Sequence, residues 1–108
     1  MKRGDVVLFD FLFSDGRGSK LRPALIVQAD FLNQAIDDTI LVLITRTPRN
    51  ATTEVAIDIS TPDGRMTGLH HDSVVDCKNL LTVEQTYIPR ILGVLSVEQM
   101  REVDEKLK

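Results

Sequence analysis

Two apolar segments of the sequence each meet a polar, cationic stretch. The run "GSKLRPALIVQ" (18–28) passes from a small basic loop into an apolar segment, with Arg22 directly before a proline. The run "ILVLITRTPRN" (40–50) goes the other way, from apolar residues to Thr45 and Arg46. A guanidinium is permanently charged and can direct two N–H donors at an anion, and a threonine hydroxyl both donates and accepts. These two boundaries are the strongest chemical signal in the sequence.

Each of these residues also has a plain structural interpretation. Arg22 can form a surface ion pair with Asp15 or another acid, and Thr45 can be an ordinary β-branched strand residue. Taken alone, the residue types favour these interpretations. The occurrence of both residues at matching boundaries is what raises the functional alternative.

The charge distribution is asymmetric. The chain has 13 basic and 16 acidic residues, a net charge of −3 that argues against non-specific binding of nucleic acid. Five basic residues nevertheless lie in or beside two loops: Arg17, Lys20, Arg22, Arg46 and Arg49. The acids gather at 37–38 and near the end of the chain. A positive cleft on an acidic protein and charge dispersed for solubility both fit this composition.

Length and composition indicate one domain, spanning 1–108, that buries an ordinary core. The sequence has no long apolar run and no secretory signal pattern, so we expect no membrane span and a cytoplasmic location. Cys77 is the single cysteine, which excludes an internal disulfide and a cysteine-based zinc site. We expect it to be a small buried residue, and we expect neither a metal site nor a cofactor.

Strands are expected over most of the chain. Apolar or alternating runs predict them at 6–13, 24–29, 39–46, 52–60, 71–77 and 90–95. The segment 33–38 is expected to be a loop or a short helical turn, and "TPDGR" (61–65) a turn. Phe9, Phe11 and Phe13 share one strand face and are expected in the core, although Phe13 lies near enough to the loop to stack on a base.

The end of the chain is expected to be helical. Ser96 and Gln99 form a capping box, and Val97, Met100, Val103 and Leu107 then recur at helical spacing. Thr82 and Gln85 have the spacing that caps a single turn before Pro89. Short strands with Gly/Pro turns and a terminal helix predict a mainly β (α+β) fold, a small barrel or curled sheet.

Four segments, in order along the chain, resemble the MazF/PemK family of toxin endoribonucleases. They are "KRGDVVLFD", "GSKLRPALIV", "LITRTPRN" and "GLHHDSVVD" leading into "NLLTVE". The resemblance implies an SH3-like small β-barrel with a C-terminal helix, as in CcdB/PemK-like proteins, forming a homodimer. It also implies metal-independent cleavage of single-stranded RNA at short sequences, and neutralisation by a cognate antitoxin with an acidic, disordered segment.

The resemblance implies that Arg22 and Thr45 are the catalytic pair. Cleavage in this family follows attack of a 2′-OH on the adjacent phosphate, which leaves a 2′,3′-cyclic phosphate and a 5′-OH. Arg22 would stabilise the added negative charge, because its pKa makes it a poor general base. The RNA-binding residues would be Arg17, Ser19, Lys20, Arg46, Thr47, Arg49, His70, Lys78 and Asn79.

The sequence departs from the family in two regions that contact bases. The first loop is shorter and more basic, with Lys20 and Leu21 between Ser19 and Arg22. Further on, Leu81 stands where the family carries a basic residue. The preferred cleavage sequence therefore does not transfer.

The adjacent histidines raise a separate possibility. Paired histidines perform the acid–base steps of other metal-free ribonucleases. Adjacent residues on extended chain point to opposite faces, so we expect that His70 and His71 do not both line one site. We expect them to be exposed or beside RNA, and a zinc pair is disfavoured.

Two alternatives belong to other functional classes. A CcdB-like toxin would bind DNA gyrase through its C-terminal segment, but this chain ends in the charged run "REVDEKLK". A barrel that binds RNA or protein without catalysis would not need Arg22 and Thr45.

Overall fold

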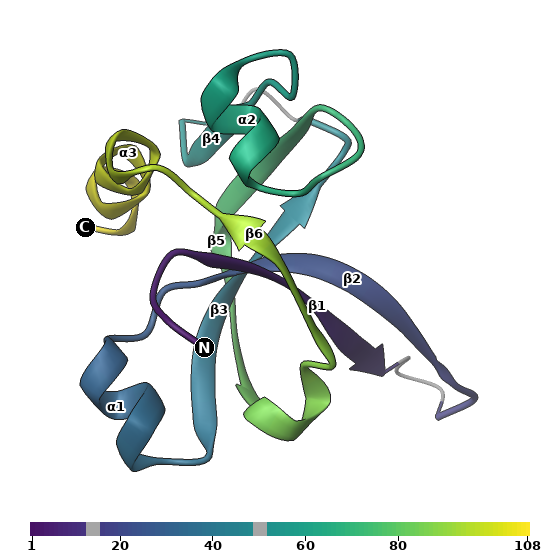
Figure 1. Cartoon of the computed structure of the whole chain (residues 1–108). Helices are drawn as coiled ribbons and strands as arrows, with labels where there is room; N and C mark the ends of the chain where they lie inside the picture. Colours follow the sequence, from purple (N-terminus) through teal and green to yellow (C-terminus); the bar gives the residue numbers. More distant parts are fainter. Residues whose placement is uncertain (13–15, 49–51) are drawn as a thin grey trace.

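A computed structural model describes residues 1–12, 16–48 and 52–108. These residues form one antiparallel sheet of six strands, which curls into a half-barrel (Figure 1). The strands are β1 (Asp5–Leu12), β2 (Ser19–Ile26), β3 (Asp38–Thr45), β4 (Glu54–Ile57), β5 (Ser73–Glu84) and β6 (Arg90–Val94). Their order across the sheet is β4-β5-β3-β2-β1-β6. The helices are α1 (Asp30–Ala35), α2 (Pro62–Met66), the 3₁₀ turn η1 (Gln85–Tyr87) and α3 (Val97–Leu107).

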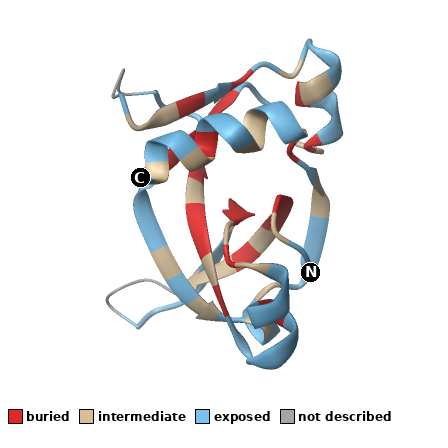
Figure 2. Cartoon of the chain, turned by 90° about the vertical axis from the view of Figure 1, so that its left-hand side faces the viewer, coloured by how far each residue is buried: buried red, intermediate tan, exposed pale blue. Residues whose placement is uncertain are grey.

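The two faces of the sheet carry separate apolar clusters. Successive side chains of a strand point to opposite faces, so Val6 and Val7 on β1 enter different clusters. One cluster includes Val42, Val75 and Val103 and lies beneath α3, where Figure 2 shows buried strands behind the helix. The other is built around Phe9 and its neighbours. Both faces of the sheet are covered here, so successive residues of β1 are buried in turn. This explains the continuous apolar run in the N-terminal half of the strand.

The C-terminal helix forms as its capping box predicts. The Ser96 hydroxyl accepts a hydrogen bond from the Gln99 amide at 3.1 Å, and the Gln99 side chain accepts from the Ser96 amide at 2.9 Å. Val103 is fully buried, and Met100 and Leu107 pack against the same cluster. The expectation for Val97 is wrong, because this first residue of the helix is 71% exposed.

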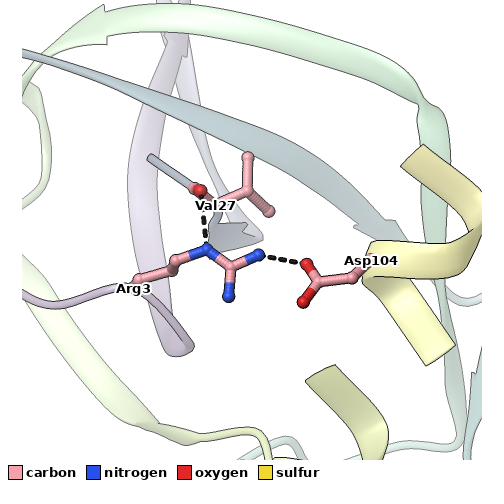
Figure 3. A network of polar contacts seen from close by, with 3 residues as sticks. All are labelled: Arg3, Val27 and Asp104. Carbon is pink, nitrogen blue, oxygen red and sulfur yellow. Dashed lines mark hydrogen bonds and ion pairs between the residues drawn. The ribbon is translucent and has the colours of Figure 1, made fainter. Parts of the chain in front are cut away.

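An arginine near the N-terminus ties α3 to the sheet. The Arg3 Nε donates to the Val27 carbonyl at 3.1 Å, and its terminal nitrogen forms an ion pair with Asp104 (Figure 3). The helix is thus held at its cap, along its apolar face and near its last turn.

Two strands are longer than their apolar patterns indicate. β2 begins at Ser19, not Ala24, because the hairpin with β1 continues to the pair Leu12–Ser19. Arg22 is therefore the fourth residue of a strand and does not precede it. β5 runs on to Glu84 instead of ending at Cys77, because its second half pairs with the start of β3 beyond a bulge. β4 shows the predicted alternation, with Val55 and Ile57 buried.

Two local expectations are also corrected. The segment "TPDGR" is not a simple turn but enters α2, which Thr61 caps by accepting from the Gly64 amide at 3.0 Å. A Cβ on Gly64 would lie 1.9 Å from the Asp58 carbonyl oxygen, a tertiary constraint that the local sequence does not reveal. The turn η1 exists, but Thr82 lies within β5 and does not cap it. Gln85 instead donates to the carbonyls of Asn33 and Ile36.

None of the helices in the described ranges has both the length and the apolar character needed to cross a membrane.

Candidate active site

A pocket of about 620 Å³ lies where one end of the sheet meets the loop before β5. Its walls come from β1, β2, β3, β6 and the segment 68–73. The charged residues that line it are all cationic: Lys20, Arg22, Arg46 and Arg90. The other polar residues that line it are Thr45, Thr47, His70, His71 and Ser73. No carboxylate of the described residues lines the pocket, so its chemistry favours an anion.

Arg22 and Thr45 line the same pocket from neighbouring strands. β2 and β3 pair from Ile26–Leu41 to Ala24–Leu43, where the ladder ends. Arg22 and Thr45 lie two residues beyond that last pair, each on its own strand. Both residues are half-buried and both line the pocket. The two cationic boundaries of the sequence are therefore brought together by strand pairing.

An aromatic ring supports the Arg22 side chain. The guanidinium carbon lies 5.9 Å from the centroid of the Phe11 ring, within the range of a cation–π contact. Phe11 in turn meets Phe9 edge to face, with centroids 6.1 Å apart. Arg22 forms no ion pair with any described residue, and Asp15 lies outside the described ranges. The guanidinium is thus oriented by packing while its N–H donors remain available.

The Thr45 hydroxyl is positioned at the last residue of β3. Its Oγ1 accepts a hydrogen bond from the Thr47 amide at 3.3 Å. This contact uses an acceptor position, so the hydroxyl proton can still be donated to a ligand. The turn after β3 also brings Arg46 and Thr47 to the pocket wall.

A fixed bend carries the two histidines. Gly68 has φ +72°, and a Cβ there would lie 2.2 Å from the Leu92 carbonyl oxygen of β6, so the bend packs closely on that strand. At its other end, Ser73 Oγ donates to the His71 carbonyl at 2.9 Å, and Asp72 accepts from the Ile59 amide at 2.9 Å. His70 and His71 are both exposed, as expected, and both line the pocket.

The expectation that the two histidines would not share one site is therefore wrong. Residues 69–72 form a bend and not a strand. The alternation of side chains that holds on extended chain does not apply there.

Most of the predicted site residues gather in this pocket. Those that line it are Arg22, Thr45, Lys20, Arg46, Thr47 and His70. Four predicted residues do not line it: Arg17, Ser19, Lys78 and Asn79. Asn79 donates to the Asp76 carboxylate instead. Arg49 and Phe13 lie outside the described residues.

Among the polar lining residues, sequence reasoning missed three: His71, Ser73 and Arg90. Arg90 is the first residue of β6, which pairs with β1 through Leu8–Arg90. Its charge could have been noticed, but its place in the pocket follows from long-range pairing.

Cys77 and Asp76 are buried side by side on β5. Cys77 is 3% exposed and belongs to the cluster beneath α3, as predicted. Burial, reinforced by the negative charge of Asp76, raises the pKa of the Cys77 thiol, and Lys106 opposes this in part. A buried thiol with a raised pKa is a poor nucleophile.

The described residues contain no cluster of three or more His, Cys, Asp or Glu side chains that could hold a metal ion. Metal independence stays a prediction.

Comparisons with known proteins agree over nearly the whole chain. Residues 2–108 match the family described as PemK-like, MazF-like toxin of type II toxin-antitoxin system. The chain is 30% identical over 111 residues to "Endoribonuclease EndoA" of Bacillus subtilis (strain 168), covering 100% of this chain and 91% of the relative.

Solved structures give the same result. An endoribonuclease in complex with its cognate antitoxin, from a Mycobacterial species, superimposes with a TM-score of 0.80 at 26% identity, over 99% of this chain and 90% of the other. A MazE–MazF structure from Deinococcus radiodurans also gives 0.80, over 99% and 92% of the chains; at 18% identity it shows the fold alone. The predicted fold is thereby confirmed as a MazF-like curled sheet with a C-terminal helix. The chain belongs to the PemK-like, MazF-like toxin family of type II toxin–antitoxin systems.

Proposed function

We propose that this MazF-like toxin endoribonuclease cleaves single-stranded RNA in the pocket lined by Arg22 and Thr45. The proposal further holds that cleavage needs no metal and leaves a 2′,3′-cyclic phosphate and a 5′-OH. One observation supports it most directly: Arg22 and Thr45 line one pocket from neighbouring strands, and every charged described residue that lines this pocket is cationic. Curated and structural relatives described as endoribonucleases support the reaction class.

Arg22 is assigned to the scissile phosphate. As the 2′-oxygen adds to phosphorus, negative charge grows on the non-bridging oxygens. A guanidinium held against Phe11 can meet that charge with two N–H donors and little reorganisation. Arginine side chains do not serve as proton donors or acceptors in proteins, so the role assigned to Arg22 is electrostatic.

Thr45 is assigned to the same phosphate. Its hydroxyl can donate to a non-bridging oxygen while Oγ1 continues to accept from the Thr47 amide. Two donors on neighbouring strands would fix the phosphate between them, and positioning of this kind lowers the entropic part of the barrier.

The other cations are assigned to flanking phosphates. Lys20 and Arg46 line the pocket next to the catalytic pair, with Thr47 and His70 beside them. Arg17 precedes β2 by two residues, and Ser19 is the first residue of that strand. Lys78 and Asn79 lie on β5 away from the pocket and would contact RNA only beyond the cleaved step.

We further propose a protein partner and an assembly state. Structural neighbours from a Mycobacterial species and from Deinococcus radiodurans were crystallised with an antitoxin. An acidic, disordered antitoxin segment that orders over the cationic pocket would compete with RNA for it.

The family resemblance also supports a homodimer. Light scattering at micromolar concentration should give twice the mass of the 12.1 kDa chain, and a monomer would contradict it.

The experiment is cleavage of a long, unstructured RNA by purified, antitoxin-free protein in EDTA. Cut sites are mapped by primer extension and product ends are tested for cyclic phosphate. A matched substrate carries one 2′-deoxynucleotide immediately 5′ of a mapped cut. We expect discrete cuts in EDTA, cyclic phosphate ends, and loss of the cut at the deoxy position. Activity that appears only with added metal, or an unimpaired cut at the deoxy position, would contradict the proposal.

A further inference from the structure

The pocket that we assign to RNA cleavage needs a group that moves protons. Attack by the 2′-OH releases a proton, and the departing 5′-oxygen requires one. Arginine cannot be deprotonated under working conditions, and a lysine ammonium ordinarily titrates near pH 10. The cations that line the pocket are all of these two types, so we assign charge stabilisation to them and look elsewhere for proton transfer: Lys20, Arg22, Arg46 and Arg90.

Imidazole is the side chain whose ordinary charge change falls between pH 5 and 8. Among the described residues that line the pocket, His70 and His71 are the two that carry this group, and no carboxylate, thiol or phenol lines it. The pocket thus holds the charge-stabilising groups and the proton-exchanging groups of a metal-free ribonuclease together.

The backbone presents the histidines on a constrained bend. At the bend's start, Thr67 is fully buried and its hydroxyl donates to the Gly64 carbonyl at 2.6 Å, while the Leu69 amide bonds to the same hydroxyl. Gly68 is pressed against the Leu92 carbonyl, and Ser73 and Asp72 fix the end of the bend. A constrained bend holds its side chains near one position, as acid–base catalysis requires.

We propose that the bend at His70 and His71 supplies the catalytic imidazole for proton transfer in RNA cleavage, an inference that rests on the proposed function. A neutral imidazole takes the proton from the 2′-OH as the 2′-oxygen–phosphorus bond forms. An imidazolium gives a proton to the 5′-oxygen as the phosphorus–5′-oxygen bond breaks. Protons and charge balance over the step, and no co-reactant is needed.

The charged groups around the bend come from four elements. Lys20 and Arg22 lie on β2, Arg46 follows β3, Arg90 begins β6, and Asp72 lies on the bend itself. Arginine, lysine and carboxylate side chains ordinarily titrate outside the interval from pH 5 to 8. A change in the rate profile within this interval therefore reports on the imidazoles.

The test is the single-turnover cleavage rate from pH 5 to 8.5. It compares the natural protein with His70→Gln, His71→Gln and the double variant. Arg101→Gln is the control, since Arg101 is exposed on α3 and does not line the pocket. Binding of a 2′-deoxy-substituted RNA is measured in parallel, because it separates affinity from chemistry. Both histidines are exposed, so the variants should keep the fold.

We expect at least one single variant to lose about 100-fold or more in rate and to lose the pH dependence between 5 and 8. Its affinity for the deoxy-substituted RNA should stay within about threefold of the natural protein. Two results would overturn the inference: a double variant with the natural rate and pH profile, or a loss confined to RNA affinity.

Failure of this inference can be told apart from failure of the proposed function. A natural protein that cleaves, with an inactive Arg22→Gln variant and unimpaired histidine variants, would reject the role of the bend alone. A natural protein that does not cleave RNA would reject both.

Discussion

Arg22 owes its position to an aromatic side chain on the neighbouring strand. Phe11 stands diagonally across from it in the β1–β2 ladder, whose register pairs Arg22 with Phe9. Cross-strand diagonals are within reach of long side chains, so the ring can hold the guanidinium without an ion pair. A carboxylate in that place would compete with the phosphate for the same donors.

We therefore expect Phe11→Leu to lower the cleavage rate about two- to fivefold, the equivalent of about 0.5–1 kcal/mol for an exposed cation–π contact. Single-turnover kinetics well below the unfolding temperature would measure it. Val83→Ala, in the same apolar cluster, is the control for general loosening. Equal effects of the two substitutions would show that Phe11 acts through stability and not through Arg22.

Because the pKa of the Cys77 thiol is raised in the folded state, the free energy of unfolding should fall at alkaline pH. The folded state favours the neutral thiol, so its contribution is fully present below the thiol's unfolded pKa, near 9.0. Above that pH the unfolded chain ionises first, and the free energy of unfolding falls as pH rises toward the folded pKa. Urea unfolding between pH 8 and 10.5 should show a steeper loss for the natural protein than for Cys77→Ala. Parallel curves would contradict the assignment.

At the scale of single residues, the sequence indicates which residue types could form the site better than it indicates where their side chains lie in the folded chain. The sequence alone shows Arg22 and Thr45 as polar residues at two apolar boundaries, and their assignment as a catalytic pair was predicted from the family resemblance. That His70 and His71 line the same pocket could not be predicted, because it depends on the bend after Gly68. The shape of this bend depends on the close contact of Gly68 with β6. Arg90 carries no local signal that separates it from other surface arginines.

The helices and strands of the fold differ in how far their local sequence alone specifies them. α3 is specified by its own capping box and apolar spacing, and it forms where they indicate. α2 depends on Gly64 meeting the Asp58 carbonyl, and the length of β5 depends on pairing with β3 beyond a bulge. Tertiary causes of this kind leave little trace in a short window of sequence.

The cap of α3 also joins two helices. Ser96 Oγ accepts from the Gln99 amide and donates to the Asp63 carboxylate of α2 at 3.1 Å. We expect Ser96→Ala to reduce the free energy of unfolding by about 1 kcal/mol and the Tm by roughly 4–8 °C. Calorimetry would measure both. Thr86→Ala, whose hydroxyl donates over 3.4 Å to an exposed carboxylate, should change little. An unchanged Tm for Ser96→Ala would show that the cap does not stabilise α3.

At the scale of the whole molecule, positive charge is concentrated at the pocket although the chain as a whole is acidic. The chain has a net charge of −3, yet the charged residues that line the pocket are all cationic within the described ranges. On the proposed function, such a distribution would favour RNA at the pocket and repel nucleic acid elsewhere. It also provides a surface that an acidic antitoxin segment could cover.

The salt dependence of RNA affinity should show how many phosphates contact this pocket. Each phosphate contact on a single strand contributes about 0.7 to the slope of log affinity against log salt. We expect Arg90→Gln to reduce that slope by about 0.7, and the matched Arg101→Gln to leave it unchanged. Binding of a deoxy-substituted RNA across salt concentrations measures both slopes. Identical slopes for the two variants would remove Arg90 from the RNA-binding surface.

The central claim is that Arg22, which lines one pocket with Thr45, stabilises the charge that develops in RNA cleavage. The most direct measurement is the single-turnover cleavage rate in EDTA of Arg22→Gln beside Arg101→Gln, with both variants shown to be folded by circular dichroism. The account predicts that Arg22→Gln loses at least about 100-fold, the typical effect of removing one donor to a developing oxyanion, while Arg101→Gln cleaves at the natural rate. A folded Arg22→Gln protein with full activity would contradict it.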